Sequence, residues 1–267
     1  MRLIRFVSGG SVHLGQIEPG NYTNARRVDG DPLVSMSVSN DVLPVDRLLS
    51  PIVPTDILCI GLNYRQHAEE TGATLTKHPL LFIKSSNSLN HPGGEIPLPG
   101  LSDKVDWEAE LAVVIGRDAK QVAAADALDY VLGYTCANDV SARDWQKDRD
   151  LGGGQFARGK SFDGFCPLGP CLVTADELRE PNALRIACDV NGERVQDGST
   201  SDMIADVPAL IESLSSTMTL RAGSVILTGT PSGVGAAMDP PRFLKPGDEV
   251  TIDIEQIGRL TNRCVAE

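Results

Sequence analysis

The segment from Asp106 to Gly116, DWEAELAVVIG, constrains the fold of this chain more than any other. It is apolar from Leu111 to Ile115, so a strand formed here must be covered on both faces. Residues two apart on a strand point to the same side, which places Glu108 and Glu110 together at its start. The alternative is an exposed strand end with two solvated glutamates. Because carboxylates that lead into a buried strand are usually paired or coordinated, the segment predicts a cation beside this pair.

Strand patterns dominate the chain from Ile57 onward, without the regular alternation of strand and helix that signals a doubly wound sheet. The expected fold class is therefore mainly β or α+β. Helical spacing of apolar residues predicts one clear helix from about Asp206 to Thr217, with shorter ones from Tyr64 to Glu70 and from Ala123 to Tyr130. The Asn-Gly pair at 191–192 predicts a two-residue hairpin turn.

The first fifty residues hold short strand-like pieces separated by polar turns, followed by a segment that contains Pro51 and Pro54. This pattern predicts a small β-rich N-terminal domain, residues 1–52, joined by a proline-bearing linker to a larger domain, residues 53–267. With 267 residues and 41% hydrophobic content, the chain is long enough to bury a large core.

The charge pattern argues against nucleic acid as a partner. The net charge is -12, and Lys and Arg form no basic stripe that could neutralise phosphates. The apolar stretch at the N-terminus is too short for a signal peptide, and no apolar run reaches the length of a membrane span. We therefore expect a soluble cytoplasmic protein that binds neither nucleic acid nor membranes.

The cysteine and histidine content limits the kinds of metal site that are possible. The six cysteines are scattered through strand-like segments, with no CxxC and no histidine at ligand spacing. Buried free thiols are therefore expected instead of zinc ligands or disulfides. Only four histidines exist, which excludes a histidine-rich site. Any bound metal must be held by oxygen.

A third carboxylate, Asp139, ends another apolar strand-like segment, VLGYTCAND. Together with Glu108 and Glu110 it would complete an oxygen shell suited to Mg²⁺ or Mn²⁺. Three carboxylates around a divalent ion leave positions open for water and a chelating substrate. The alternative for Asp139 alone is a helix cap before the residues that follow it.

The segment NYRQHAEE, residues 63–70, carries a candidate general base. In a helix, His67 and Glu70 lie at i and i+3, where the carboxylate can orient the imidazole. Gly61 and Gly72 flank the segment like hinges, as a moving lid requires. The alternative is a surface helix with an incidental histidine.

Two glycine-containing loops need separate interpretations. GQFARGKS, Gly154 to Ser161, matches the phosphate-binding loop pattern, but no buried strand precedes it and the FDGFCPLGP that follows cannot sustain a helix. A nucleotide site is therefore not expected. TGTPSGVG, Thr228 to Gly235, follows an apolar strand, and its backbone N–H groups and threonines either hold a carboxylate or form a plain tight turn.

Taken together, these segments resemble the fumarylacetoacetate hydrolase family from about Ile57 to the C-terminus. The motifs stand in family order: ILCIGLNYRQHAEE, DWEAELAVVIG, GYTCANDVSARDWQ, GKSFDGFCPLGP, VNGERVQ and LTGTPSGVG. The first fifty residues are similar only to the family's variable N-terminal domain. The strand ILCIGLN lacks the fourth carboxylate of fumarylacetoacetases proper, so the chain resembles the shorter bacterial-type branch.

The resemblance implies a mixed β-sandwich roll core, a homodimer, and one Mg²⁺ or Mn²⁺ per active site. It implies site residues in three groups, which are the metal ligands Glu108, Glu110 and Asp139, the catalytic residues His67, Glu70 and Lys160, and the substrate-contacting residues Arg143, Gln146 and Thr230. The match of Lys160 to the lysine at the metal site makes the phosphate-loop pattern a coincidence.

These roles favour a metal-dependent hydrolase that cleaves a carbon–carbon bond. The substrate would be a β-diketo acid, an acylpyruvate or a 2,4-diketo-3-deoxy sugar acid, split into pyruvate and an acid by water that His67 and Glu70 activate. The alternative is an oxaloacetate decarboxylase or a 2-hydroxyhepta-2,4-diene-1,7-dioate-type isomerase that uses the same site. A nonenzymatic binding protein that keeps the fold is a further alternative.

Overall fold

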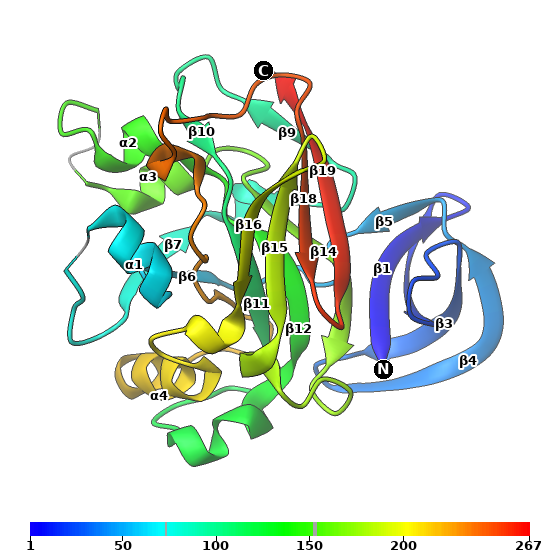
Figure 1. Cartoon of the computed structure of the whole chain (residues 1–267). Helices are drawn as coiled ribbons and strands as arrows, with labels where there is room; N and C mark the ends of the chain where they lie inside the picture. Colours follow the sequence, from blue (N-terminus) through cyan, green and yellow to red (C-terminus); the bar gives the residue numbers. More distant parts are fainter. Residues whose placement is uncertain (73, 152–153) are drawn as a thin grey trace.

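The computed structural model spans the chain and describes every residue except 73, 152 and 153. Two sheets make up most of it (Figure 1). The larger, twelve-stranded sheet runs β4-β3-β2-β1-β14-β12-β11-β17-β6-β7, with β5 beside β1 and β8 beside β14. Its strands are β1 (Arg2–Ser8), β2 (Ser11–Ile17), β3 (Asn24–Asp31), β4 (Ser35–Pro44), β5 (Arg47–Leu49), β6 (Ile57–Gly61), β7 (Leu80–Lys84), β8 (Leu89–Asn90), β11 (Ala109–Ile115), β12 (Val131–Asn138), β14 (Cys166–Thr174) and β17 (Val225–Leu227).

The second sheet has five strands in the order β16-β15-β18-β19-β9 and packs against β11, β12 and β14 of the first. Its strands are β9 (Glu95–Leu98), β15 (Arg185–Val190), β16 (Glu193–Ser199), β18 (Glu249–Ile254) and β19 (Gly258–Ala266), and a separate short pair is formed by β10 (Val105–Asp106) and β13 (Ser141–Ala142). The expected β-sandwich core of a mainly β or α+β fold is therefore confirmed.

Strand β11 is buried along its whole length, as its sequence predicted. It pairs antiparallel with β12 on one side and with β17 on the other. Leu111 and Val113 belong to the large core shared with the five-stranded sheet, whereas Ala112 and Val114 belong to a second apolar cluster. Because side chains alternate along a strand, Glu110 points to the same side as Ala112 and Val114.

The N-terminal strands continue the larger sheet. Strand β1 pairs antiparallel with β14, with Arg2 opposite Val173 and Leu3 opposite Leu172. Strands β2, β3 and β4 then follow in order away from β14, on the blue side of Figure 1. The division into domains 1–52 and 53–267 stays a prediction.

Four α-helices are present in the described residues: α1 (Arg65–Thr71), α2 (Arg143–Lys147), α3 (Phe156–Lys160) and α4 (Val207–Thr217). The expected long helix is confirmed as α4, and the Asp206 side chain caps it by accepting the Ala209 N–H. Helix α1 confirms the expected one near residues 64–70 and ends at Gly72, whose φ of 60° is left-handed. The third predicted helix forms as the 3₁₀-helix η2 (Ala124–Tyr130).

The predicted two-residue turn between β15 and β16 is confirmed. The hairpin between β15 and β16 turns at Asn191 and Gly192, both with positive φ, as a two-residue turn of the predicted kind requires. All six cysteines are buried and free. Within the described residues, no helix is long and apolar enough to cross a membrane.

Candidate active site

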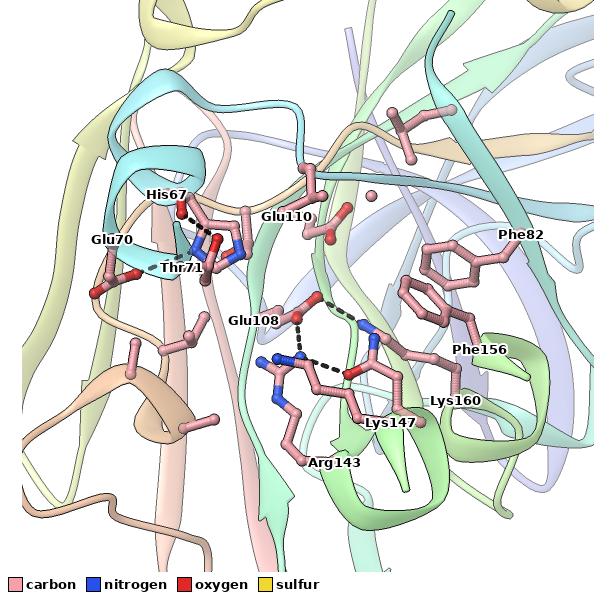
Figure 2. Close-up of a pocket in the computed structure, with 18 residues that line it drawn as sticks. His67, Glu70, Thr71, Phe82, Glu108, Glu110, Arg143, Lys147, Phe156 and Lys160 are labelled. Carbon is pink, nitrogen blue, oxygen red and sulfur yellow. Dashed lines mark hydrogen bonds and ion pairs between the residues drawn. The ribbon is translucent and has the colours of Figure 1, made fainter. Parts of the chain in front are cut away.

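A cavity of about 420 Å³ lies between α1, β11, α2, α3 and the loop that follows β17 (Figure 2). All the predicted site residues except Asp139 line it. Asp139 is fully buried and accepts a hydrogen bond from Lys160, which does line the cavity. The structure therefore brings residues from five separate sequence motifs to one place.

The three predicted metal ligands form a buried acidic cluster. One carboxylate oxygen from each of Glu108, Glu110 and Asp139 lies within 4.8 Å of the others. The antiparallel register of β11 and β12 explains this, since Ala109 pairs with Asn138 and the next residues outward are Glu108 and Asp139. The backbone confirms the proximity, because the Asp139 N–H donates to the Glu108 carbonyl over 3.0 Å.

Three buried cationic side chains contact the cluster. Lys160 Nζ donates to Glu108 Oε2 and to Asp139 Oδ2, each over 2.7 Å. Lys84 Nζ donates to Asp139 Oδ1 over 2.6 Å. Arg143 Nη1 lies 2.6 Å from Glu108 Oε1. Burial disfavours the charged form of Glu108, but Lys160 and Arg143 outweigh it and hold the pKa of this carboxyl well below its usual range.

Glu110 differs from the other two carboxylates. Its Oε2 accepts the Gly229 N–H over 2.7 Å, and no cationic side chain in the described residues lies within ion-pair distance of it. Burial, followed by the charges of Asp139 and Glu108, raises its pKa well above the usual value. Its ionised form therefore needs a further cation.

The charge balance fits a divalent metal. Four buried carboxylates, those of Asp106, Glu108, Glu110 and Asp139, face three cations, Lys84, Arg143 and Lys160, which leaves one negative charge uncompensated. Uncompensated buried charge is costly, and hard oxygen ligands suit a divalent cation. The acidic cluster is thus suited to hold one.

The predicted pairing of His67 and Glu70 is present on α1. His67 Nδ1 lies 3.1 Å from Glu70 Oε2, and Glu70 Oε1 accepts the Gly233 N–H over 3.0 Å. This leaves Nε2 as the ring nitrogen that Glu70 does not engage. In Figure 2 the His67 ring projects toward Glu108 and Glu110. A carboxylate that orients an imidazole in this way suits the imidazole to proton transfer.

The loop after β17 anchors carboxylates from three parts of the site. Gly229 N–H donates to Glu110, Gly233 N–H to Glu70, and Gly235 N–H to Asp106. The loop thus holds the protein's own carboxylates, one of the two possibilities that its sequence left open. Thr230 of this loop lines the cavity, and its hydroxyl accepts a hydrogen bond from Gln196 Nε2 over 2.8 Å.

The phosphate-loop pattern has no phosphate-binding geometry. Lys160 ends the five-residue helix α3, whereas a phosphate-loop lysine stands where a helix begins. Its ammonium is already bound by Glu108 and Asp139, whose charges raise its pKa although burial opposes this. Gly152 and Gly153, just before the pattern, lie outside the described residues.

Sequence reasoning missed three residues of the site. Lys84 ends the apolar strand PLLFIK, a position like the one that singled out Asp139. Asp106 precedes Glu108 by two residues, the same spacing that links Glu108 to Glu110. Lys147 follows Arg143 by one helical turn and also lines the cavity. Each signal was in the sequence, but none was specific by itself.

Comparisons with known proteins agree on one family. The chain matches the family model described as "Fumarylacetoacetate (FAA) hydrolase C-terminal" over residues 56–265. It is 48% identical over 218 residues to "Oxaloacetate tautomerase FAHD2A, mitochondrial" of Homo sapiens, an alignment that covers 81% of this chain and 69% of that protein.

Two solved structures extend the likeness to the whole chain. The 5-carboxymethyl-2-hydroxymuconate delta-isomerase from Mycobacterium smegmatis has a TM-score of 0.87 at 38% identity and covers 100% of both chains. The 2-hydroxyhepta-2,4-diene-1,7-dioate isomerase from Mycobacterium marinum also has a TM-score of 0.87, at 40% identity, and covers 100% of this chain and 99% of that one. Because these likenesses include residues 1–55, the N-terminal strands belong to the shared fold.

Proposed function

The chain belongs to the fumarylacetoacetate hydrolase family, and from that premise we propose that it interconverts the enol and keto forms of small 2-oxo acids such as oxaloacetate. The observation that carries the proposal is that His67, held by Glu70, and the acidic cluster line one cavity. The name of the 48% identical relative and the titles of the two solved structures support a tautomerase or isomerase over the hydrolase that the sequence motifs favoured.

The proposal includes one Mg²⁺ or Mn²⁺ held by Glu108, Glu110 and Asp139. When bound, such a cation draws electron density from the oxo and carboxylate oxygens of the substrate. The Arg143 guanidinium and the Lys160 ammonium stand beside the cluster and supply fixed positive charge where the substrate oxygen becomes negative. Both groups are buried, so water screens them little.

His67 is proposed to carry the proton. In the enol-to-keto direction the substrate hydroxyl loses a proton, the adjacent carbon gains one, and the double bond moves from carbon–carbon to carbon–oxygen. His67 Nε2 accepts the first proton and delivers one to carbon, so the reaction consumes no water. Glu70 holds Nδ1 and the Gly233 N–H holds Glu70, which keeps the ring aimed into the cavity.

The test follows the ultraviolet absorbance of enol-oxaloacetate as it converts to the keto form. We expect the protein with Mg²⁺ to accelerate this decay well above the buffer rate, and His67→Ala to lower kcat about 100-fold or more, as loss of a general acid–base does. Chelation of the metal should abolish the acceleration. A decay rate equal to that of buffer with Mg²⁺ alone would refute the proposal.

Hydrolysis of an acylpyruvate remains a second candidate, because an imidazole oriented by a carboxylate can equally activate water. Pyruvate release from acylpyruvates and carbon dioxide release from oxaloacetate, measured on the same preparation, separate the reactions. Pyruvate release from acylpyruvates that is faster than tautomerisation would make hydrolysis the main activity.

A homodimer is also part of the proposal, since the family resemblance implies it, and light scattering on a sizing column tests it.

A further inference from the structure

Helix α2 presents two cationic side chains to the cavity. Arg143 and Lys147 are four residues apart, so they lie on one face of this single helical turn, and both line the cavity. Figure 2 shows both below Glu108, with Lys147 between the Arg143 and Lys160 labels. Arg143 is buried and Lys147 is partly exposed, which places Lys147 at the outer part of the same wall.

The two side chains have unequal partners. Arg143 donates through Nε to Asp106 and through Nη1 to Gln146, and Nη1 also pairs with Glu108, yet its buried Nη2 has no partner in the described structure. Lys147 forms no ion pair with any described carboxylate. On this wall of the cavity, Lys147 therefore carries an unpaired positive charge, and Arg143 keeps a buried N–H group without a partner in the described structure.

The ammonium of Lys147 is a charge that the neighbouring carboxylates do not pair with. Partial burial and the Arg143 guanidinium lower its pKa, whereas Glu108 and Asp106, which pair with Arg143, act in the opposite direction. The opposite wall, on α1, carries the Glu70 carboxylate. In a substrate with a negative group at each end, the outer negative group is therefore repelled by Glu70 on α1 and attracted by Lys147 on α2.

We propose that Lys147 determines substrate specificity by binding the distal carboxylate of a 2-oxo dicarboxylic acid. The oxo-acid end then lies at the acidic cluster and the distal carboxylate lies against α2. The inference rests on the proposed function for the identity of the oxo-acid end, and it adds the residue that distinguishes dicarboxylic from monocarboxylic substrates.

Binding of a matched pair of ligands tests this without turnover. The probes are 2-oxoglutarate and 2-oxovalerate, which have the same chain length and differ only in a terminal carboxylate against a terminal methyl. Calorimetric titration of the Mg²⁺-loaded protein should give a Kd about tenfold lower for 2-oxoglutarate, as one charge-assisted hydrogen bond to a partly exposed group provides. In Lys147→Gln the ratio should fall below about twofold, and in Lys147→Glu it should invert.

The control is Lys120→Gln, since Lys120 is also exposed but donates to the Ser216 carbonyl and does not line the cavity. It should keep the wild-type ratio, and thermal unfolding should show that every variant folds. A second measurement raises the sodium chloride concentration, which should lower the wild-type ratio because Lys147 is exposed to screening.

The outcomes distinguish this inference from the proposed function. If both ligands bind wild type with a ratio near one, or if Lys147→Gln keeps the tenfold ratio, the role of Lys147 is refuted while the oxo-acid site stands. If Lys147→Gln weakens both ligands equally, Lys147 has a structural role and the inference also fails. If neither ligand binds the Mg²⁺-loaded wild type, the proposed function and this inference fail together.

Discussion

Asp106 and Arg143 form a buried ion pair in which the guanidinium Nε donates to the carboxylate Oδ2 over 2.8 Å. The same carboxylate accepts the N–H groups of Gly235 and Ala236. One side chain thus fixes both the cationic wall on α2 and the loop that holds Glu110 and Glu70. The wall and loop of the cavity are coupled through this single carboxylate.

Replacing Asp106 with Asn should therefore weaken both the fold and the site. The amide offers only one acceptor oxygen, and its NH₂ group would face the donors that the second oxygen now satisfies. Because Arg143 would lose a buried partner, we expect a loss of about 3 kcal/mol in the free energy of unfolding. Urea denaturation measures this loss, and KM should rise because Arg143 is no longer held.

The matched control is Asp197→Asn, which removes an exposed pair with Arg185 whose Oδ2–Nη2 distance is 2.6 Å. Exposed pairs contribute little, so the free energy of unfolding should change by less than about 1 kcal/mol. An Asp106 variant as mild as this control would show that the buried pair does not organise the cavity.

Glu110→Gln should separate stability from activity. In metal-free protein the raised pKa of Glu110 reflects the cost of a buried carboxyl whose ionised form no cation offsets, and an amide avoids this cost while still accepting the Gly229 N–H. We expect the metal-free variant to unfold at a higher temperature than metal-free wild type. Mg²⁺ should raise the Tm of wild type, by mass action, and leave that of the variant unchanged. Turnover should fall to background.

Calorimetric scans with and without Mg²⁺ measure the Tm of wild type and of Glu110→Gln and so test both expectations. A variant that is less stable than wild type without metal, yet still gains stability from Mg²⁺, would contradict both the charge balance and the role of Glu110 as a ligand.

Local periodicity explains how much of this site the sequence predicts. Glu108 and Glu110 follow from the two-residue repeat of a strand, and His67 with Glu70 from the helical repeat, because each pair is set by backbone geometry over a few residues. The burial of β11 follows from its continuous apolar run. Asp139 stands out because a charge that ends an apolar strand needs a partner.

The partners of those carboxylates depend on long-range pairing, which one sequence does not encode locally. Lys84 is 55 residues from Asp139, and Gly235 is 129 residues from Asp106. The same limit applies to the sheet order, in which β1 lies beside β14 because residues 2 and 173 pair. Such contacts exist only in the assembled fold, so local sequence patterns do not identify Lys84 and Asp106 as residues of the site.

Lys84 supports the acidic cluster from outside the cavity, which gives a further prediction. The residue is 3% exposed, and its ammonium donates to Asp139 Oδ1 and to the Val140 carbonyl. Lys84→Met fills similar volume but leaves Asp139 with one fewer cation, so we expect a loss of about 3 to 5 kcal/mol in unfolding free energy. Added Mg²⁺ should recover part of this loss in a thermal scan, since it supplies the missing charge. A variant as stable as wild type without metal would rule out this role.

His91 should make the stability of the fold depend on pH, away from the active site. Its Nδ1 accepts the Ser50 N–H over 3.1 Å, which only the neutral ring can do, and burial followed by Arg5 and Arg47 lowers its pKa below the ordinary 6.5. At a pH between the lowered pKa of His91 in the folded protein and its ordinary pKa of 6.5 in the unfolded chain, the unfolded chain therefore binds more protons than the folded one. The stabilisation from His91 is present above pH 6.5 and is lost as the pH falls below it.

His91→Asn keeps an acceptor for Ser50 but does not titrate. In urea unfolding at a series of pH values, its free energy of unfolding should therefore drop less below pH 6.5 than that of wild type. Identical drops in both proteins would mean that other groups cause the acid sensitivity.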